Sequence, residues 1–160
     1  MKHKLNNLVE IISSTPLNYD HSVGFHDVRP FNKLNNNLVL LHRYPLNELG
    51  FKTKDDTTIE ICLWDISNNS IEKIDDTEAW SWEQGARLQW VNEKEFIYNK
   101  RIDGKLVACI YDIKTKIKKN LKNTVYCINK NKYFLHINFS RLWKLWKSYG
   151  YFTPTDETKY

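Results

Sequence analysis

The residues best suited to catalysis or metal binding are few in this sequence. His21, His26 and Asp27 combine two imidazoles with a carboxylate, which are ligand types that zinc and related metals take, but their spacing matches no known metal motif. The sequence contains no nucleophile elbow, no phosphate-binding loop and no Cys-x-x-Cys pair. We therefore predict no catalytic residue, no resident metal and no cofactor.

Recognition of a polar or planar ligand is the chemistry that the sequence favours instead. Aromatic rings stack on apolar ligand faces while polar side chains fix orientation, and a forked guanidinium such as that of Arg101 can grip a carboxylate or phosphate. Several candidates have a structural alternative, for instance Trp80 and Trp82 as wedges between packed sheets. The candidate ligand-binding residues are His26, Asp27, Trp80, Trp82, Gln84, Arg87, Arg101, Arg141, Tyr149 and Tyr151.

Internal repeats indicate which elements position these residues. The segment 61–66 (ICLWDI) matches 108–113 (ACIYDI) at an offset of 47, and each runs into a polar turn of the kind that closes a hairpin. A second pattern, a short strand followed by an Asn-containing turn and an apolar strand, occurs around residues 30–41, 89–98 and 126–135. The segment 9–15 resembles 71–77, the expected outer strand of the first repeat.

These repeats predict an all-β chain that forms part of a β-propeller. We expect about two and a half four-stranded antiparallel blades, preceded by an N-terminal outer strand, in a single incomplete domain. Helical periodicity is absent except for a turn near 140–147. An open sheet or sandwich of about ten strands is the alternative. The predicted units are an outer strand at 8–13, a blade at 27–75 whose first strand is 27–31, a blade at 87–121, a half blade at 124–139 and a C-terminal loop at 140–160.

In a propeller, the connections between blades and those between second and third strands emerge on one face. That face would carry nearly all the candidate residues, including the loop over 44–57, and loops on a rigid scaffold commonly carry function. Since propellers have four to eight blades, we expect this chain to be a fragment, or to associate with other copies through unclosed blade edges.

The motif over 80–90 (WSWEQGARLQW), with 26–30 (HDVRP), 138–142 (NFSRL) and 148–151 (SYGY), resembles a family of bacterial propellers of the TolB and WD40-like type. Members of that family are associated with polysaccharide and glycosyltransferase functions. The resemblance implies a propeller fold over residues 20–152, with this chain as an N-terminal fragment.

Composition limits the partners that we expect. The net charge is +5, but the lysines are dispersed, so no nucleic-acid partner is predicted. The three cysteines lie within apolar strand patterns at wide spacing, which predicts buried thiols. No apolar run approaches the length needed to span a membrane and no signal segment is recognisable, so we expect a cytoplasmic protein without a membrane partner.

Three functions remain open from the sequence. The first is a binding module for a saccharide or other polar ligand. The second is an enzyme on acidic carbohydrates, a lyase or hydrolase using His21 or His26 with a metal, whose site is completed by further blades. The third is a scaffold for a protein partner.

Overall fold

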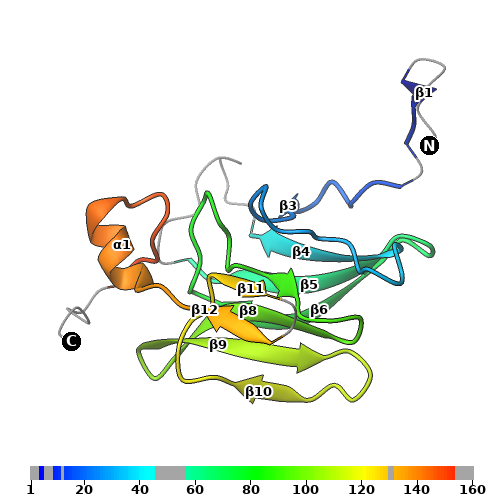
Figure 1. Cartoon of the computed structure of the whole chain (residues 1–160). Helices are drawn as coiled ribbons and strands as arrows, with labels where there is room; N and C mark the ends of the chain where they lie inside the picture. The colour runs from blue at the N-terminus through cyan, green and yellow to red at the C-terminus, as the bar shows by residue number, and fades with distance from the viewer. Residues whose placement is uncertain (1–3, 6–8, 12, 46–56, 130–131, 154–160) are drawn as a thin grey trace.

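The computed structural model describes residues 4–5, 9–11, 13–45, 57–129 and 132–153 (Figure 1). The described part is all-β apart from one short helix, and its largest elements are two four-stranded antiparallel sheets. The first sheet has the order β3-β4-β5-β6, with strands Asp20–Ser22, Leu38–Tyr44, Ile59–Asp65 and Ser70–Thr77. The second has the order β7-β8-β9-β10, with strands Gln89–Trp90, Glu95–Ile102, Lys105–Asp112 and Lys118–Asn120.

Three smaller elements complete the described chain. The strands β11 (Cys127–Asn129) and β12 (Tyr133–Leu135) form a two-stranded pair, as do β1 (Lys4–Leu5) and β2 (Val9–Glu10) near the N-terminus. The helix α1 spans Phe139–Leu145 and lies at one side of the molecule in Figure 1. Asn138 caps α1 by accepting a hydrogen bond from the Arg141 N–H at 2.8 Å.

The sequence repeat folds as a structural repeat. Asp65 and Asp112 end β5 and β9, and each carboxylate accepts backbone N–H groups of the turn that follows, at 2.8–3.0 Å. Asn69 and Lys116, at matching positions of the two turns, both have a positive φ, at 57° and 62°. The same side-chain chemistry and backbone conformation therefore close both hairpins.

Corresponding positions in the two sheets also face the same way. Ile61 and Leu63 in β5 join the core that the first sheet shares with the second, whereas Cys62 belongs to a cluster on the opposite face. In β9, Cys109 faces the first sheet, and Ala108 joins a cluster on the opposite face that includes Val125 and Ile128. Matching positions of β5 and β9 thus lie on equivalent faces of the two sheets.

The two sheets pack around a shared apolar core, and polar contacts join their edges. The core combines residues of both sheets, all less than 9% exposed; its members include Leu40, Tyr44, Ile59, Ile61, Phe96, Tyr98 and Tyr111. At the inner edge, the Trp90 Nε1–H donates to the Pro30 carbonyl at 2.8 Å. Between β6 and β8, the Lys100 ammonium lies 2.6 Å from the Asp75 carboxylate, to which the Tyr98 hydroxyl also donates.

The structure corrects the predicted first strand of the first sheet. Residues 27–31 do not form a continuous strand; only Phe31 bridges to Val39, and the strand that pairs with the far end of β4 is β3. The chain leaves the sheet between these points through Gly24, which has φ +86°, and a turn in which the Val28 N–H donates to the Phe25 carbonyl at 3.0 Å. Pro30 lacks an N–H and contributes only its carbonyl, which accepts from Leu40 at 3.0 Å.

Other predicted segments contain the following elements. The segment 8–13, predicted to be an outer strand, contains β2, which pairs with β1. The segment 124–139, predicted to be a half blade, contains the short pair β11–β12, and the predicted loop at 140–160 contains most of α1. Residues 46–56 of the loop over 44–57, and residues 154–160, lie outside the described part.

Candidate functional site

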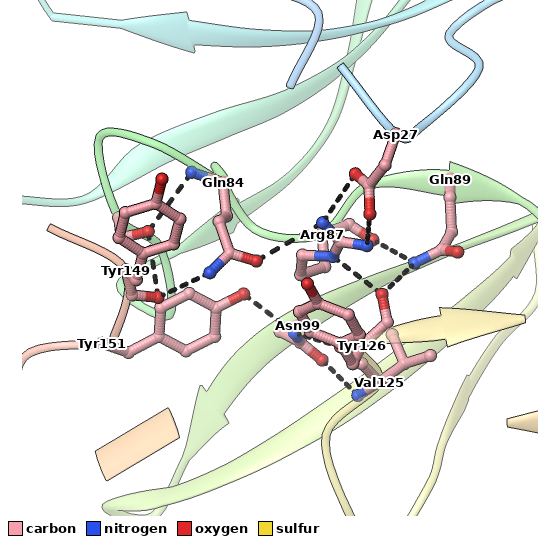
Figure 2. Close-up of polar contacts among 10 residues, drawn as sticks. Asp27, Gln84, Arg87, Gln89, Asn99, Val125, Tyr126, Tyr149 and Tyr151 are labelled. Atoms are coloured by element: carbon pink, nitrogen blue, oxygen red, sulfur yellow. Dashed lines mark hydrogen bonds and ion pairs between the residues drawn. The ribbon is translucent and has the colours of Figure 1, made fainter. Parts of the chain in front are cut away.

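Arg87 lies at the centre of a buried polar network between the two sheets (Figure 2). Its side chain is 1% exposed, and its two Nη atoms donate to the two carboxylate oxygens of Asp27 at 2.9 and 3.0 Å. The Nε–H donates to the Tyr126 carbonyl at 2.7 Å, and the guanidinium lies over the Tyr126 ring at 4.3 Å. The bidentate ion pair compensates for burial of the charge, because it satisfies the directions in which the guanidinium donates.

Gln84 extends this network to the C-terminal segment. Its Nε2 donates to the Tyr149 carbonyl at 3.0 Å, and its Oε1 accepts from Arg87 at 3.4 Å. Gln89 supports the same arginine by donating to the Arg87 carbonyl at 3.0 Å. The network therefore joins four chain segments that are distant in sequence: Asp27, residues 84–89, Tyr126 and Tyr149.

Asn99 and Tyr151 form a second buried contact beside the first. The Asn99 side chain donates to the Tyr151 hydroxyl at 2.9 Å and to the Val125 carbonyl at 2.8 Å, and accepts from the Val125 N–H at 2.7 Å. The Tyr151 ring stacks on Phe139, with centroids 4.0 Å apart. Complete burial raises the pKa of Tyr151, so its hydroxyl stays protonated at neutral pH.

His42 takes the same position in the first sheet that Asn99 takes in the second. His42 pairs with Ile61 and Asn99 pairs with Ala108, and these two partners are matching residues of the sequence repeat. The Ala86 N–H donates to the His42 Nε2 at 3.0 Å, as the Val125 N–H donates to Asn99. Burial lowers the pKa of His42 to about 4, so the ring is neutral at pH 7.

Trp80 and Trp82 form an aromatic group with Tyr44. Trp80 is 2% exposed and its Nε1–H donates to the Thr57 carbonyl at 2.6 Å, so it is a packing residue. Trp82 stacks on Tyr44 with centroids 5.7 Å apart and an interplanar angle of 12°, and half of its surface remains exposed.

The remaining predicted residues lie at the margins of this network. Arg101 donates to the Gly104 carbonyl at 2.9 Å and to the Phe152 carbonyl. His26 is exposed, with its ring 4.0 Å from that of Phe25, and Arg141 is exposed on α1. The structure thus brings Asp27, Gln84, Arg87, Tyr149 and Tyr151 together around shared contacts and leaves the other predicted residues outside them.

A hollow of about 630 Å³ opens beside β7, between the segment that precedes β4 and the start of β11. It is lined by residues between Asp27 and Leu34, by residues 89–93 and by Ile128, so that all three repeats contribute. Phe31 is 43% exposed there, beside the charged side chains of Arg29 and Glu93. Of the predicted ligand contacts, only Asp27 lines this hollow. The other residues that line the hollow were not among the sequence-based candidates, because those candidates were chosen from the expected loops. The pattern that occurs three times, around residues 30–41, 89–98 and 126–135, was the sequence signal that pointed to this region.

The described residues offer no group of three or more His, Cys, Asp and Glu side chains placed to hold a metal ion. Burial raises the pKa of the Cys62 thiol to about 11 and also raises that of Cys109, so neither is a thiolate nucleophile at neutral pH. Among the helices in the described ranges, none is long and apolar enough to cross a membrane.

Comparisons with protein-family models, with curated proteins and with solved structures gave no match.

Proposed function

We propose that this chain is a ligand-binding module of the β-propeller type, in which the two four-stranded sheets are successive blades. The packing supports this arrangement, because matching positions of β5 and β9 lie on equivalent faces of the two sheets, and the second sheet packs on the first sheet with one face and on Val125 and Ile128 with the other. The pair β11–β12 then represents the first half of a third blade, with Ile128 packed against the second sheet.

The ligand in this proposal is a saccharide or another polar molecule of similar size. It occupies the hollow that residues 27–34, residues 89–93 and Ile128 line. The observation that carries the proposal is the composition of this hollow. Phe31 offers an exposed ring, Asn92 an amide, and Arg29 and Glu93 charges of opposite sign. A ring that stacks on the apolar face of a sugar, together with polar groups that bond its hydroxyls, is the usual chemistry of such a site.

The buried network below the hollow has a supporting role in this proposal. Asp27 lines the hollow and is held by the bidentate contact with Arg87, and Arg87 is in turn contacted by Gln84. These contacts fix the position of the Asp27 carboxylate before a ligand arrives, which lowers the entropic cost of binding.

A glycan array probed with the chain tests the proposal. We expect binding to a defined set of glycans, with Phe31→Ala and Glu93→Gln each weakening that binding by about tenfold, equivalent to about 1.4 kcal/mol. Leu17→Ala is the matched control, because Leu17 is fully exposed and does not line the hollow. If no glycan is bound, or if Phe31→Ala and Leu17→Ala bind alike, this function is wrong.

A further inference from the structure

The end of α1 and the two residues after it expose both apolar and cationic side chains. Leu145 is 77% exposed and Trp146 is 60% exposed. Arg141, Lys144 and Lys147 are exposed within the same seven residues. We call these five residues the α1 patch.

The α1 patch is held in a fixed conformation. The opposite side of α1 is anchored, since Phe139 and Ser140 are buried and Leu142 packs against the cluster that contains Tyr151. The chain then folds back, so that the Tyr149 and Gly150 N–H groups donate to the Trp146 carbonyl at 3.1 and 3.2 Å.

Two further contacts stabilise this reversal of the chain after α1. The Trp146 and Tyr149 rings lie 4.3 Å apart. Gly150 fits so closely against the Trp143 backbone that a Cβ there would lie 1.9 Å from the Trp143 nitrogen. The exposed leucine and tryptophan are thus presented by a rigid support.

We infer that the α1 patch docks the chain on an anionic lipid surface. Tryptophan is favoured at the boundary between lipid headgroups and acyl chains, leucine inserts into the apolar region, and lysine and arginine are attracted to anionic headgroups. A nucleic-acid strand could stack on Trp146 but would leave Leu145 in water, so the combination favours a lipid surface. Figure 1 shows α1 at one side of the molecule.

This inference is independent of the proposed ligand in the hollow. It also changes the sequence-based expectation of no membrane partner, which relied on the absence of a spanning segment. Docking through a patch needs only a few inserted side chains and surrounding cations.

Co-sedimentation of the chain with lipid vesicles tests the inference. We expect binding to vesicles of phosphatidylcholine mixed with phosphatidylserine, little binding to phosphatidylcholine alone, and weaker binding as salt is added. Leu145→Ser and Trp146→Ala should each weaken binding about tenfold or more, because each removes an inserted apolar group. The double change Lys144→Glu with Lys147→Glu should have an effect at least as large.

Matched controls separate the patch from general properties of the chain. Leu17→Ser changes a leucine that is fully exposed and lies outside both α1 and the hollow. Lys114→Glu with Lys119→Glu makes the same change in net charge at two exposed lysines near and in β10. Both controls should bind vesicles like the unchanged chain, and circular dichroism should show that every variant is folded.

Three results would overturn the inference. The first is equal binding to vesicles with and without phosphatidylserine, or no binding to either. The second is an equal loss in the patch variants and the matched controls, which would indicate a general charge effect. The third is patch-dependent binding to a single-stranded RNA oligonucleotide without binding to vesicles, which would make the patch a nucleic-acid surface.

Discussion

At the scale of single residues, two matching buried positions hold different side chains. His42 and Asn99 both accept a backbone N–H from the segment that leads to the next unit. An amide accepts this bond at any ordinary pH, whereas an imidazole can accept it only when the accepting nitrogen is unprotonated. The hydrogen bond at His42 in the first sheet therefore depends on pH, whereas the matching bond at Asn99 in the second sheet does not.

We predict that stability falls as the pH is lowered from about 6.5 to 4 and that His42→Asn reduces this fall. The pKa of His42 is about 4 in the folded chain and 6.5 when unfolded, so the unfolded state binds the additional proton in this range. The loss from His42 should reach about 3 kcal/mol near pH 4 and be absent above pH 6.5. Urea unfolding across this range measures it. His26→Asn, which changes an exposed histidine, is the control and should keep the His42 contribution; an unchanged pH profile in His42→Asn would refute the assignment.

At the scale of elements, the segment that joins the two sheets approaches β4 closely at Gly85. Gly85 has φ +56°, and a Cβ there would lie 2.4 Å from the His42 Cε1. Gly104, in the β8–β9 turn, also has a positive φ, +78°, but a Cβ there meets open space. Both glycines therefore adopt a backbone conformation that other residues rarely adopt, but only at Gly85 would a side chain also collide with a neighbouring residue.

We expect Gly104→Ala to destabilise the chain by about 1–2 kcal/mol, the cost of a side chain in the left-handed region. Gly85→Ala should cost about 1–3 kcal/mol more, because the added methyl group must displace the buried His42 ring. Urea unfolding of both variants at pH 7 provides the comparison. Equal losses in the two variants would show that the close contact is unimportant.

The strand quartets could be predicted from sequence because matching segments such as 61–66 and 108–113 carry the alternation and turn residues that determine a hairpin. The replacement of the predicted strand 27–31 by β3 and the bridge at Phe31 could not be predicted. It depends on how Gly24 and Pro30 direct the chain beside β4. The candidate residues could be selected from the sequence by residue type, but the burial of their side chains could not be predicted. Arg87, Gln84 and Tyr151 have the chemistry of ligand contacts, and only tertiary packing places their polar atoms against other segments of the same chain.

At the scale of the whole molecule, the two sheets share one apolar core, so neither is complete without the other. Phe96 of the second sheet is fully buried in that core, with its ring 5.2 Å from Tyr111 and beside residues of the first sheet. The sheets should therefore unfold together.

Phe96→Ala should cost about 3–5 kcal/mol and lower the hydrogen-exchange protection of β4 and β5 as much as that of β8 and β9. Phe134→Ala serves as the control, because Phe134 is 40% exposed, and it should change stability by less than about 1 kcal/mol. Loss of protection confined to the second sheet would mean that the two sheets are separate folding units.

The chain of contacts from Asp27 through Arg87 and Gln84 to the Tyr149 carbonyl has a mechanical consequence. These hydrogen bonds are arranged in series and connect the rim of the hollow with the segment that folds back on α1. A displacement at one end is transmitted to the other through these directional hydrogen bonds, so the rim of the hollow and the segment around Tyr149 should move together.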